Sequence, residues 1–478
     1  MTTPNASAGG AGQDDLGAAP GGLLAPLPSD RPSVERRAVL PAGFAAGATT
    51  AGIKASGRPD LALVHATAGP AAAAAVFTTN QVVAAPVEAS RSNLAITRPE
   101  GRGDGRDHYG RAQAIVATSG SANAATGLAG LADQVAIAHA VAANLHVDPS
   151  TILSLSTGII GTRLPVEKVV AGIVTLAGNG LATDDAAFAS VAEALRTTDS
   201  VAKVAATRLE LPAPDGTPVT VTVAGAAKGV GMIHPRMATM LAIVLTDAAV
   251  SPATLHGLLR AATVRTWNQL SVDGDTSTND TVFLLASGAS AAGPVLPGTP
   301  EAAALGAAVE AVGRDLARQQ AADGEGATTL ITCGVSGARD DVDARAVARA
   351  VVSSSLVKAA IHGRDPNWGR IAGAAGNARL GEARLLETAG LAREEAQRRS
   401  GSPAFVDPRA LRIAIAGHLV YDGPAGGPAA HDRQAVRAAM DAPQALIRLD
   451  LGVGDGRGEA FGCDLTEEYV IENAEYTT

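Results

Sequence analysis

The chain has 478 residues, enough for two or three domains or for two large lobes that share an interface. Hydrophobic residues make up 46% and charged residues 18%, which is typical of folded soluble proteins and excludes wholesale disorder. The net charge of −9 disfavours nucleic acid as a partner, because an acidic surface repels phosphates. Only Cys333 and Cys463 occur, which excludes a disulfide framework and favours two buried free thiols over one long-range disulfide.

The N-terminal segment indicates neither a targeting signal nor ordered structure. Residues 1–33 are rich in Ala, Gly and Pro without periodicity and predict a disordered extension, with order beginning near Val39. No Lys or Arg precedes Arg31, which disfavours a secretory or mitochondrial signal. No run of 18 uncharged apolar residues occurs, so we expect no membrane span and a cytoplasmic location.

The hydrophobic pattern beyond this segment predicts strands mixed with helices. Because they follow no strict βαβ rhythm, we expect layered α/β (α+β) lobes. In chain order, the expected elements are strands at Leu61–Ala66 and Ala114–Thr118; helices at Leu131–Leu145, Val166–Ala177 and Asp184–Arg196; strands at Val219–Ala224 and Met240–Leu245; a helix at Pro252–Arg265; a strand at Thr281–Leu285; helices at Pro300–Gln319 and Asp343–Ala360, the latter broken near its three serines; and strands at Leu411–Ala416, Ala445–Leu451 and Glu459–Leu465.

Common catalytic and binding motifs fail when tested residue by residue. The glycines at 452–458 miss the dinucleotide fingerprint because Arg457 stands where the last glycine belongs. The acidic run 273–280 misses a calcium loop, with Thr278 at its sixth position and Leu284 at its twelfth. HExxH and GxSxG are both missing. We therefore expect no metal site and no ordinary serine hydrolase.

A series of polar segments punctuated by glycine remains unexplained. Each alone is compatible with a plain turn. Together, in this order, they resemble the ornithine acetyltransferase (glutamate N-acetyltransferase) family from about residue 39 to the C-terminus. The segments are AGIKASGRPDLAL at 51–63, STGIIG at 156–161, KGVGMIHPRMATML at 228–241, DGDTSTNDT at 273–281, DPNWGRIAGAAG at 365–376 and GCDLTEEYVIENAEY at 462–476.

The resemblance implies that the precursor cleaves itself between Ala238 and Thr239. An α chain ending at 238, ordered from about 34, and a β chain of 239–478 would result. The new N-terminal Thr239 would hold a nucleophilic hydroxyl and an α-amine, whose pKa of about 7.7–8.0 suits a general base near neutrality. The competing interpretation is that Met237–Leu245 is only the start of a buried strand.

The resemblance also implies roles for residues distant from Thr239. Thr157 and Gly158 would donate to the oxyanion, from a hydroxyl and a backbone N–H, although a simple strand-to-helix turn is the alternative. Lys228 suits a substrate carboxylate and Glu325 an ammonium, and this pairing could be reversed. Either Thr197 or Thr198 should contact substrate, with Thr197 favoured. The substrate-binding set is Thr197, Lys228, Thr239, Glu325, Asn473 and Thr478, so the C-terminal tail should fold back over the site.

The family's fold and reaction complete these expectations. The fold is a two-lobed sandwich of β-sheets layered between helices, with a self-cleaved N-terminal nucleophile. The expected reaction is ping-pong transfer of acetyl from N2-acetylornithine to glutamate in arginine biosynthesis, within a heterotetramer of two α and two β chains. No cofactor is expected, and acetyl-CoA stays open as a second donor. Two alternatives also stay open: an N-terminal-nucleophile amidohydrolase or aminopeptidase, and an uncleaved paralogue that only binds amino acids.

Overall fold

A computed structural model describes residues 32–101, 107–234 and 240–474. Most of the predicted N-terminal extension therefore lies outside the described residues. The described structure begins at residue 32, seven residues before Val39, near which order was expected to begin. The carbonyl of Ser33 accepts a 2.6 Å hydrogen bond from Thr207 Oγ1, and Glu35 pairs with Ala206 across an antiparallel bridge.

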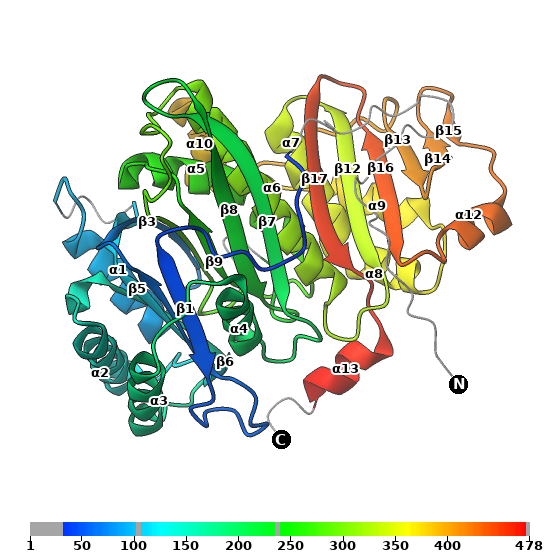
Figure 1. The fold of residues 1–478 in the computed structure, drawn as a ribbon. Coiled ribbons are helices and arrows are strands. Elements are labelled where there is room, and N and C mark those ends of the chain that lie inside the picture. The colour runs from blue at the N-terminus through cyan, green and yellow to red at the C-terminus, as the bar shows by residue number, and fades with distance from the viewer. Residues whose placement is uncertain (1–31, 102–106, 235–239, 475–478) are drawn as a thin grey trace, which may run out of the picture.

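The described residues form two lobes built on three sheets (Figure 1). The left lobe in that view contains a six-stranded sheet at its centre, with two strands from beyond residue 240 set between strands from before residue 229. Its order is β4 (Tyr109–Ala112), β3 (Ala71–Phe77), β11 (Thr281–Ala286), β9 (Leu241–Thr246), β8 (Pro218–Lys228) and β7 (Lys203–Pro212).

Side chains of this central sheet alternate between two apolar layers, as the period of two in a strand requires. In β9, Leu241, Ile243 and Leu245 pack on the face that meets the four-stranded sheet. Ala242 and Val244 pack on the opposite face, against helices α5 (Pro252–Arg265) and α6 (Pro300–Ala322). Both faces are buried, so the sheet is the core of the lobe.

The four-stranded sheet forms the outer layer of the same lobe. Helices α2 (Gly127–Leu145) and α3 (Val166–Gly178) cover its outer face, while α1 (Ala85–Ile96) and α4 (Asp185–Leu195) pack in the core between the two sheets. Its order is β1 (Phe44–Thr49), β2 (Leu61–Ala66), β5 (Ala114–Ser121) and β6 (Ile152–Ile159), with β5 and β6 parallel.

The right lobe is a seven-stranded sheet packed against α7 (Asp341–Ser353), α8 (Ser355–His362) and α9 (Trp368–Gly376). Helix α6 joins the lobes, because its buried side chains share one core with Phe461 of β17. The sheet order is β10 (Leu270–Ser271), β17 (Gly456–Cys463), β12 (Leu330–Ala338), β16 (Gln444–Asp450), β13 (Arg412–Ile415), β14 (His418–Asp422) and β15 (Gly427–Pro428).

Local sequence signals fix several helix ends. Ser251 caps α5 by accepting a hydrogen bond from Thr254 N, and Pro252 follows in the first turn. The expected break among the three serines falls at Ser354, whose side chain caps α8. The remaining helices are α10 (Ala383–Thr388), α11 (Arg393–Arg399), α12 (Arg433–Ala439), α13 (Glu467–Ala474), and the 3₁₀ turns η1 (Pro149–Thr151) and η2 (Trp267–Gln269).

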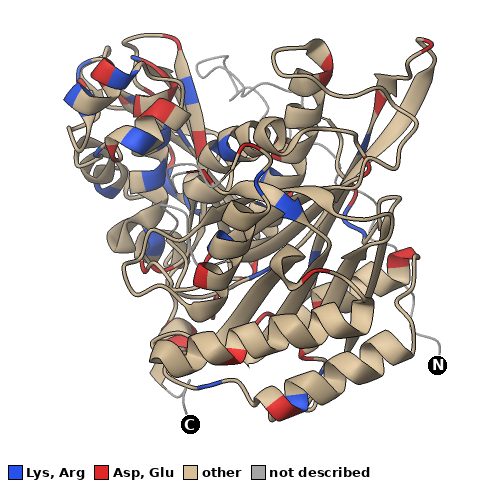
Figure 2. Ribbon diagram, turned by 90° about the vertical axis from the view of Figure 1, so that its left-hand side faces the viewer, with Lys and Arg blue, Asp and Glu red and all other residues tan. Residues whose placement is uncertain are grey.

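Helix α2 is long and apolar enough to cross a membrane by length and composition alone. Its buried residues, among them Ile137 and Val141, lie on one face and belong to the core shared with α3 and the four-stranded sheet. Figure 2 shows few charges on α2 and α3, which run along the bottom of that view. One such helix is weak evidence for a membrane, because core helices pass the same test. Cys333 and Cys463 are free and buried, as expected.

Candidate functional site

Strand β6, at the edge of the four-stranded sheet, carries Thr157 and Gly158 near its C-terminal end, in a stretch where its pairing with β5 is irregular. Gly158 has φ +129°, and a Cβ there would lie 2.3 Å from the carbonyl carbon of Gly120 in β5. Only glycine fits both conditions. The β5–β6 register is irregular at this point, where Ser121 pairs with both Thr157 and Ile159. The backbone here departs from a plain strand, and both Thr157 and Gly158 remain partly exposed.

Asn279, from the DGDTSTNDT segment, holds this irregular stretch in place from the other half of the chain. Its Nδ2 donates to the carbonyls of Ala122, 2.6 Å away, and Ser156, 2.8 Å away. These two carbonyls flank the irregular stretch of β5 and β6. A single buried amide therefore holds the ends of β5 and β6 together at this point.

Lys228 is the last residue of β8, and its ammonium reaches the same end of β6. Lys228 Nζ donates to Thr157 Oγ1 at 3.2 Å and lies 3.9 Å from the carboxylate of Asp199. Burial lowers the pKa of Lys228, and the charge of Asp199 opposes that shift. Because Thr157 accepts from Lys228, the hydroxyl hydrogen of Thr157 is left to donate in another direction.

Behind Lys228 lies a buried ion network that the sequence did not reveal. Asp199 accepts from Lys203 Nζ at 2.8 Å and from Gly229 N at 2.8 Å, and Lys203 also donates to Asp323 at 2.6 Å. Burial alone raises the pKa of Asp199, but Lys228 and Lys203 outweigh it and hold that pKa below its usual range. The network links three segments of the chain: residues 199–203, residues 228–229 and Asp323.

Glu325 lies at the junction of three segments. Its backbone N–H donates to the carbonyl of Val230, and its carboxylate accepts from Thr198 Oγ1 at 2.9 Å and from Asn473 Nδ2 at 3.0 Å. A Cβ on Gly231 would lie 2.1 Å from Glu325 Oε2. The glycine in KGVG is therefore needed for the carboxylate to pack here.

The structure brings together most of the described residues that the resemblance implies. Thr198 Oγ1 donates to Glu325, whereas the N–H of Thr197 donates to Asp199 at 3.0 Å. The contact of either threonine with substrate stays a prediction. The C-terminal segment does return to the site, since Asn473 on α13 reaches Glu325. Thr466 Oγ1 donates to the carbonyl of Gly326 and holds the start of α13 against the same loop.

Three predicted positions lie outside the described residues: Ala238, Thr239 and Thr478. Met240, the residue after Thr239, is buried and leads into β9, which pairs with β11 on one side and with Lys228 of β8 on the other.

Asp280 was part of a recognised motif but was assigned no role. It is 2% exposed and directly precedes β11, and neither of its carboxylate oxygens has a well-formed hydrogen bond among the described residues. Burial raises the pKa of Asp280 well above its ordinary value, although the Met240 N–H, the Thr78 hydroxyl and the charge of Lys228 act in the opposite direction. Among the described residues, no group of three or more His, Cys, Asp or Glu side chains could hold a metal ion.

The fold and these groups define a layered α/β protein whose site combines a buried ammonium, hydroxyl donors and a carboxylate, which suits a small zwitterion such as an amino acid. The chain belongs to the ArgJ family, whose profile matches residues 45–478. The family and the mixed α/β architecture expected from the motifs are thereby confirmed.

Individual relatives are similar over nearly the whole chain. The arginine biosynthesis bifunctional protein ArgJ of Synechocystis sp. is 44% identical over 458 residues, 93% of this chain and 98% of the relative. The protein of the same name from Thermus thermophilus is 41% identical over 439 residues, 92% of this chain and 99% of the relative. A solved chain of Mycobacterium tuberculosis ornithine acetyltransferase, complexed with ornithine, is 38% identical; the match covers 42% of this chain and 97% of that chain, with a TM-score of 0.36.

Proposed function

We propose that this chain is a glutamate N-acetyltransferase that moves an acetyl group from N2-acetylornithine to glutamate in arginine biosynthesis. Membership of the ArgJ family and relatives named for arginine biosynthesis support this function. The structural observation that carries it is the 3.2 Å hydrogen bond from Lys228 to Thr157, beside Gly158, whose positive φ and close approach to Gly120 require a glycine. It supplies an oriented hydroxyl donor and a cation within one site.

Maturation in this proposal precedes acetyl transfer. The Thr239 hydroxyl attacks the carbonyl of Ala238, and the peptide C–N bond breaks as the acyl group moves from nitrogen to oxygen. Water then hydrolyses the ester. The products are the Ala238 carboxylate and a Thr239 with a free hydroxyl and a free α-amine.

Acetyl transfer then takes place in two halves. Thr239 Oγ attacks the acetyl carbonyl of N2-acetylornithine, and its proton passes through the α-amine to the departing ornithine nitrogen as the C–N bond breaks. The amine of glutamate attacks the resulting acetyl ester, and Thr239 Oγ recovers a proton. Thr157 Oγ1 and Gly158 N donate to the oxyanion in both halves.

The charged residues position the amino-acid parts of both substrates in this scheme. Lys228 attracts the carboxylate, and Glu325 attracts the ammonium. Each oxygen of Glu325 accepts one hydrogen bond, from Thr198 or from Asn473, and each has a second lone pair left for substrate. Thr197 shapes the loop through its N–H bond to Asp199, and Thr478 belongs to the same proposed tail.

The assembly and location form part of the same proposal. Cleavage would leave both chains in one sheet, because β9 and β11 lie between β8 and β3. Two such cleaved units would pair into a heterotetramer in the cytoplasm. The reaction requires no cofactor, and acetyl-CoA is a candidate second donor.

An assay of purified protein tests the proposal. Denaturing electrophoresis should resolve two fragments, and mass spectrometry should place the cut at Ala238–Thr239. Ornithine release from N2-acetylornithine should accelerate when glutamate is added, with acetylglutamate formed in equal amount. Release that glutamate does not accelerate would instead indicate a hydrolase, and a single uncleaved chain without turnover would indicate a binding paralogue.

A further inference from the structure

The loop at residues 51–60 belongs to a motif that the proposed reaction leaves without a role. It follows β1 and lies at the bottom of the left lobe in Figure 1. The buried carboxylate of Asp60 shapes it, because that group accepts hydrogen bonds of 2.6–3.0 Å from the backbone N–H groups of Ala51, Ile53 and Lys54. Three donors on one carboxylate hold the loop, and the side chains it carries, in one arrangement.

This loop packs against the strand that supports the proposed oxyanion donors. A Cβ on Gly120 of β5 would lie 2.9 Å from Ile53 Cγ2, and a Cβ on Gly158 would lie 2.3 Å from the carbonyl carbon of the same Gly120. Gly120 is therefore in close contact with both the loop and the end of β6. The loop borders the site at the point where Thr157 and Gly158 stand.

Two cations of the loop reach the segment that follows α4. Lys54 Nζ donates to the carbonyls of Ala194, at 3.1 Å, and Pro59, at 2.8 Å. Arg58 Nη2 donates to the carbonyl of Thr197 at 2.7 Å. Carbonyl groups neutralise no charge, and in the described part of the chain neither of the two side chains forms an ion pair. Both positive charges are therefore available to an anionic group of a ligand.

The charge of Lys54 is close enough to the site to interact with it. Burial first, and then the charges of Arg58 and Lys228, lower the pKa of Lys54 to about 8. The carboxylates of Asp60 and Asp199 oppose this shift. Two of the three donors of the ammonium are used by carbonyls, which leaves one for a ligand.

Three contacts, one from each residue of the segment 197–199, connect the loop to the charged groups of the site. They are Thr197 with Arg58 at 2.7 Å, Thr198 with Glu325 at 2.9 Å, and Asp199 with Lys228 at 3.9 Å. Consecutive Cα atoms are about 3.8 Å apart, so these contacts meet at most about 8 Å of backbone, close to the length of an extended glutamate.

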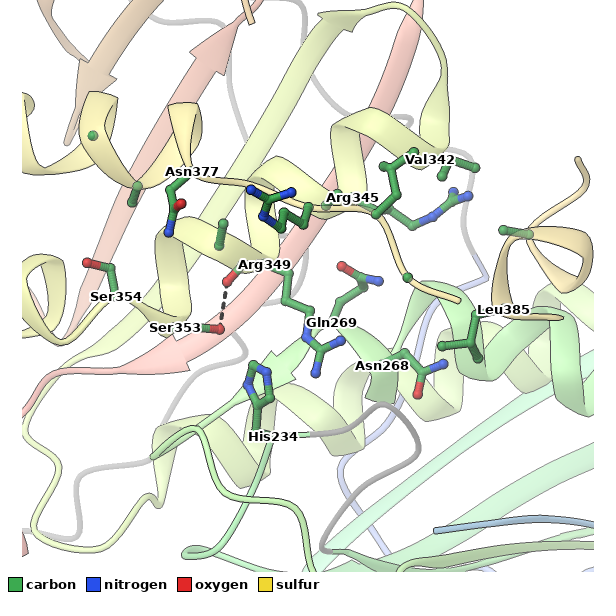
Figure 3. A pocket seen from close by; sticks show the side chains of 18 of the residues that line it. His234, Asn268, Gln269, Val342, Arg345, Arg349, Ser353, Ser354, Asn377 and Leu385 are labelled. Atoms are coloured by element: carbon green, nitrogen blue, oxygen red, sulfur yellow. Dashed lines mark hydrogen bonds between the residues drawn. The ribbon is translucent and has the colours of Figure 1, made fainter. Parts of the chain in front are cut away.

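The proposed acceptor needs one more cation than Lys228 supplies. Lys228 accounts for one carboxylate and Glu325 for one ammonium, whereas glutamate carries two carboxylates. Arg345 and Arg349 supply positive charge elsewhere, where Figure 3 shows them at a cavity of about 900 Å³. The described lining of that cavity includes none of Thr157, Lys228 and Glu325, so its arginines do not serve this site.

We propose that Lys54 and Arg58 bind the side-chain carboxylate of glutamate and thereby select the acetyl acceptor. The inference rests on the proposed acetyl transfer to glutamate and adds the group that recognises the acceptor. The same two cations repel the side-chain ammonium of ornithine, which is drawn to Glu325 instead. Glutamate is therefore favoured over ornithine as the amine that attacks the acetyl-enzyme.

Acceptor selectivity tests the proposal. The quantity measured is kcat/KM for glutamate divided by kcat/KM for glutamine, which has the same shape without the second carboxylate. Lys54→Gln should lower this ratio about tenfold or more, the usual effect of losing one charged hydrogen bond, and Lys54→Arg should restore most of it. Release of ornithine in the first turnover should stay within about threefold of the parent rate, because N2-acetylornithine has no second carboxylate.

Lys168→Gln is the matched control. Lys168 is exposed on α3 and donates to the carbonyl of Gly52 at 3.3 Å, so it also contacts the loop. The same loss of charge at this position should leave the selectivity ratio unchanged.

The pH dependence of the ratio separates a charged contact from a structural one. Lys54 loses its proton near pH 8, so the ratio for the parent should fall as the pH rises from about 7 to about 9. The ratio for Lys54→Arg should stay constant, because arginine keeps its charge over that range. Titration of the Thr239 α-amine affects both acceptors alike and cancels in the ratio.

The outcomes distinguish this inference from the proposed function. Acetyl transfer to glutamate by the parent, with a ratio that Lys54→Gln and Arg58→Gln both leave within about threefold, would overturn the inference alone. If the parent transfers no acetyl group to glutamate, the proposed function fails. Isothermal titration of the full-length protein with glutamate and glutamine then decides whether the carboxylate position exists.

In that titration, glutamate that binds about tenfold more tightly than glutamine, with the preference lost in Lys54→Gln, supports the carboxylate position. Equal binding of the two amino acids refutes it. Should Lys54→Gln not fold, Arg58→Gln decides in both experiments, because the side chain of Arg58 is exposed.

Discussion

Lys228 Nζ donates a 3.2 Å hydrogen bond to Thr157 Oγ1, across 71 residues of sequence. An ammonium has three donors and no acceptor, so the hydroxyl of Thr157 must be the acceptor. The hydrogen of the Thr157 hydroxyl is then free to donate to an acceptor other than Lys228, such as a substrate oxygen. Lys228 therefore orients the hydroxyl and also places positive charge next to the oxyanion that the proposed reaction forms.

Thr157→Val tests this relationship, because valine keeps the shape and loses the hydroxyl. We expect kcat for acetyl transfer to fall about 100- to 1000-fold, the usual cost of one oxyanion donor, with a much smaller change in KM. Thr157→Ser should retain most activity. Thr175→Ala, on the exposed side of α3, is the matched control. Steady-state kinetics would contradict the role if Thr157→Val kept kcat within about threefold of the parent value.

Asp199→Asn should destabilise the protein at neutral pH. The variant removes one of the two carboxylates that pair with the buried Lys203, and also the carboxylate 3.9 Å from Lys228. Breaking a buried ion pair costs about 3–5 kcal/mol. The pKa of Asp199 is depressed in the folded state, so its stabilising contribution is present above the ordinary Asp pKa and is lost as pH falls through the folded value.

Urea unfolding at several pH values measures this contribution. The difference in the free energy of unfolding between the parent and Asp199→Asn should be largest at pH 7 and should begin to shrink below about pH 4. The exposed Asp455→Asn serves as the control and should leave stability unchanged at every pH. If this difference in the free energy of unfolding grew as the pH fell, Asp199 would not be a stabilising carboxylate with a lowered pKa.

Asp280 should show the opposite dependence on pH. Burial raises its pKa in the folded state, so the folded protein binds its proton more tightly than the unfolded chain does. The contribution of this group to the free energy of unfolding is fully present below the ordinary Asp pKa of about 3.9. It is lost as the pH rises toward the pKa of Asp280 in the folded protein. Asp280→Asn should therefore gain stability relative to the parent between pH 4 and pH 8. If the free energies of unfolding of the two proteins changed in parallel across that pH range, the pKa of Asp280 would not be raised in the folded protein.

The sequence predicted those elements whose signals are local. Pro252–Arg265 is a helix between the expected bounds, since Ser251 and Pro252 form a start signal that needs no tertiary contact. The break at Ser354 follows from the same capping chemistry. The family motifs likewise identified the ArgJ family and the function that agrees with it, because those motifs are long and specific.

Elements that depend on tertiary contacts were missed. Strand β3, Ala71–Phe77, contains five consecutive alanines, which have little preference for strands. It is a strand because it lies between β4 and β11 and is buried on both faces, where small side chains allow close layers. The ion network of Asp199, Lys203 and Asp323 was missed for a related reason. Charges separated by up to 124 positions meet only after α6 packs against β7 and β8 of the central sheet.

Gly231→Ala should act on substrate binding through Glu325. The new methyl group would lie 2.1 Å from Glu325 Oε2 and must displace the carboxylate from Asn473 or Thr198. Because a charged hydrogen bond contributes about 1.5–3 kcal/mol, we expect KM for the amino-acid substrates to rise about 10- to 100-fold. Gly178→Ala, where an added Cβ meets nothing within 4 Å, is the matched control. Unchanged KM values in a folded Gly231→Ala protein would remove Glu325 from the substrate site.

The shared central sheet predicts how the two proposed chains behave after cleavage. Strands β9 and β11 come from the β chain, and each hydrogen-bonds along its length to an α-chain strand, β8 or β3. Both faces of these strands are buried, so separation would expose unpaired backbone groups and apolar side chains together. The cleaved chains of 238 and 240 residues should therefore co-elute in size-exclusion chromatography and separate only in denaturant. Cleaved chains that separated in native buffer would contradict a common core, because breaking one peptide bond removes none of the hydrogen bonds between β8 and β9 or between β3 and β11.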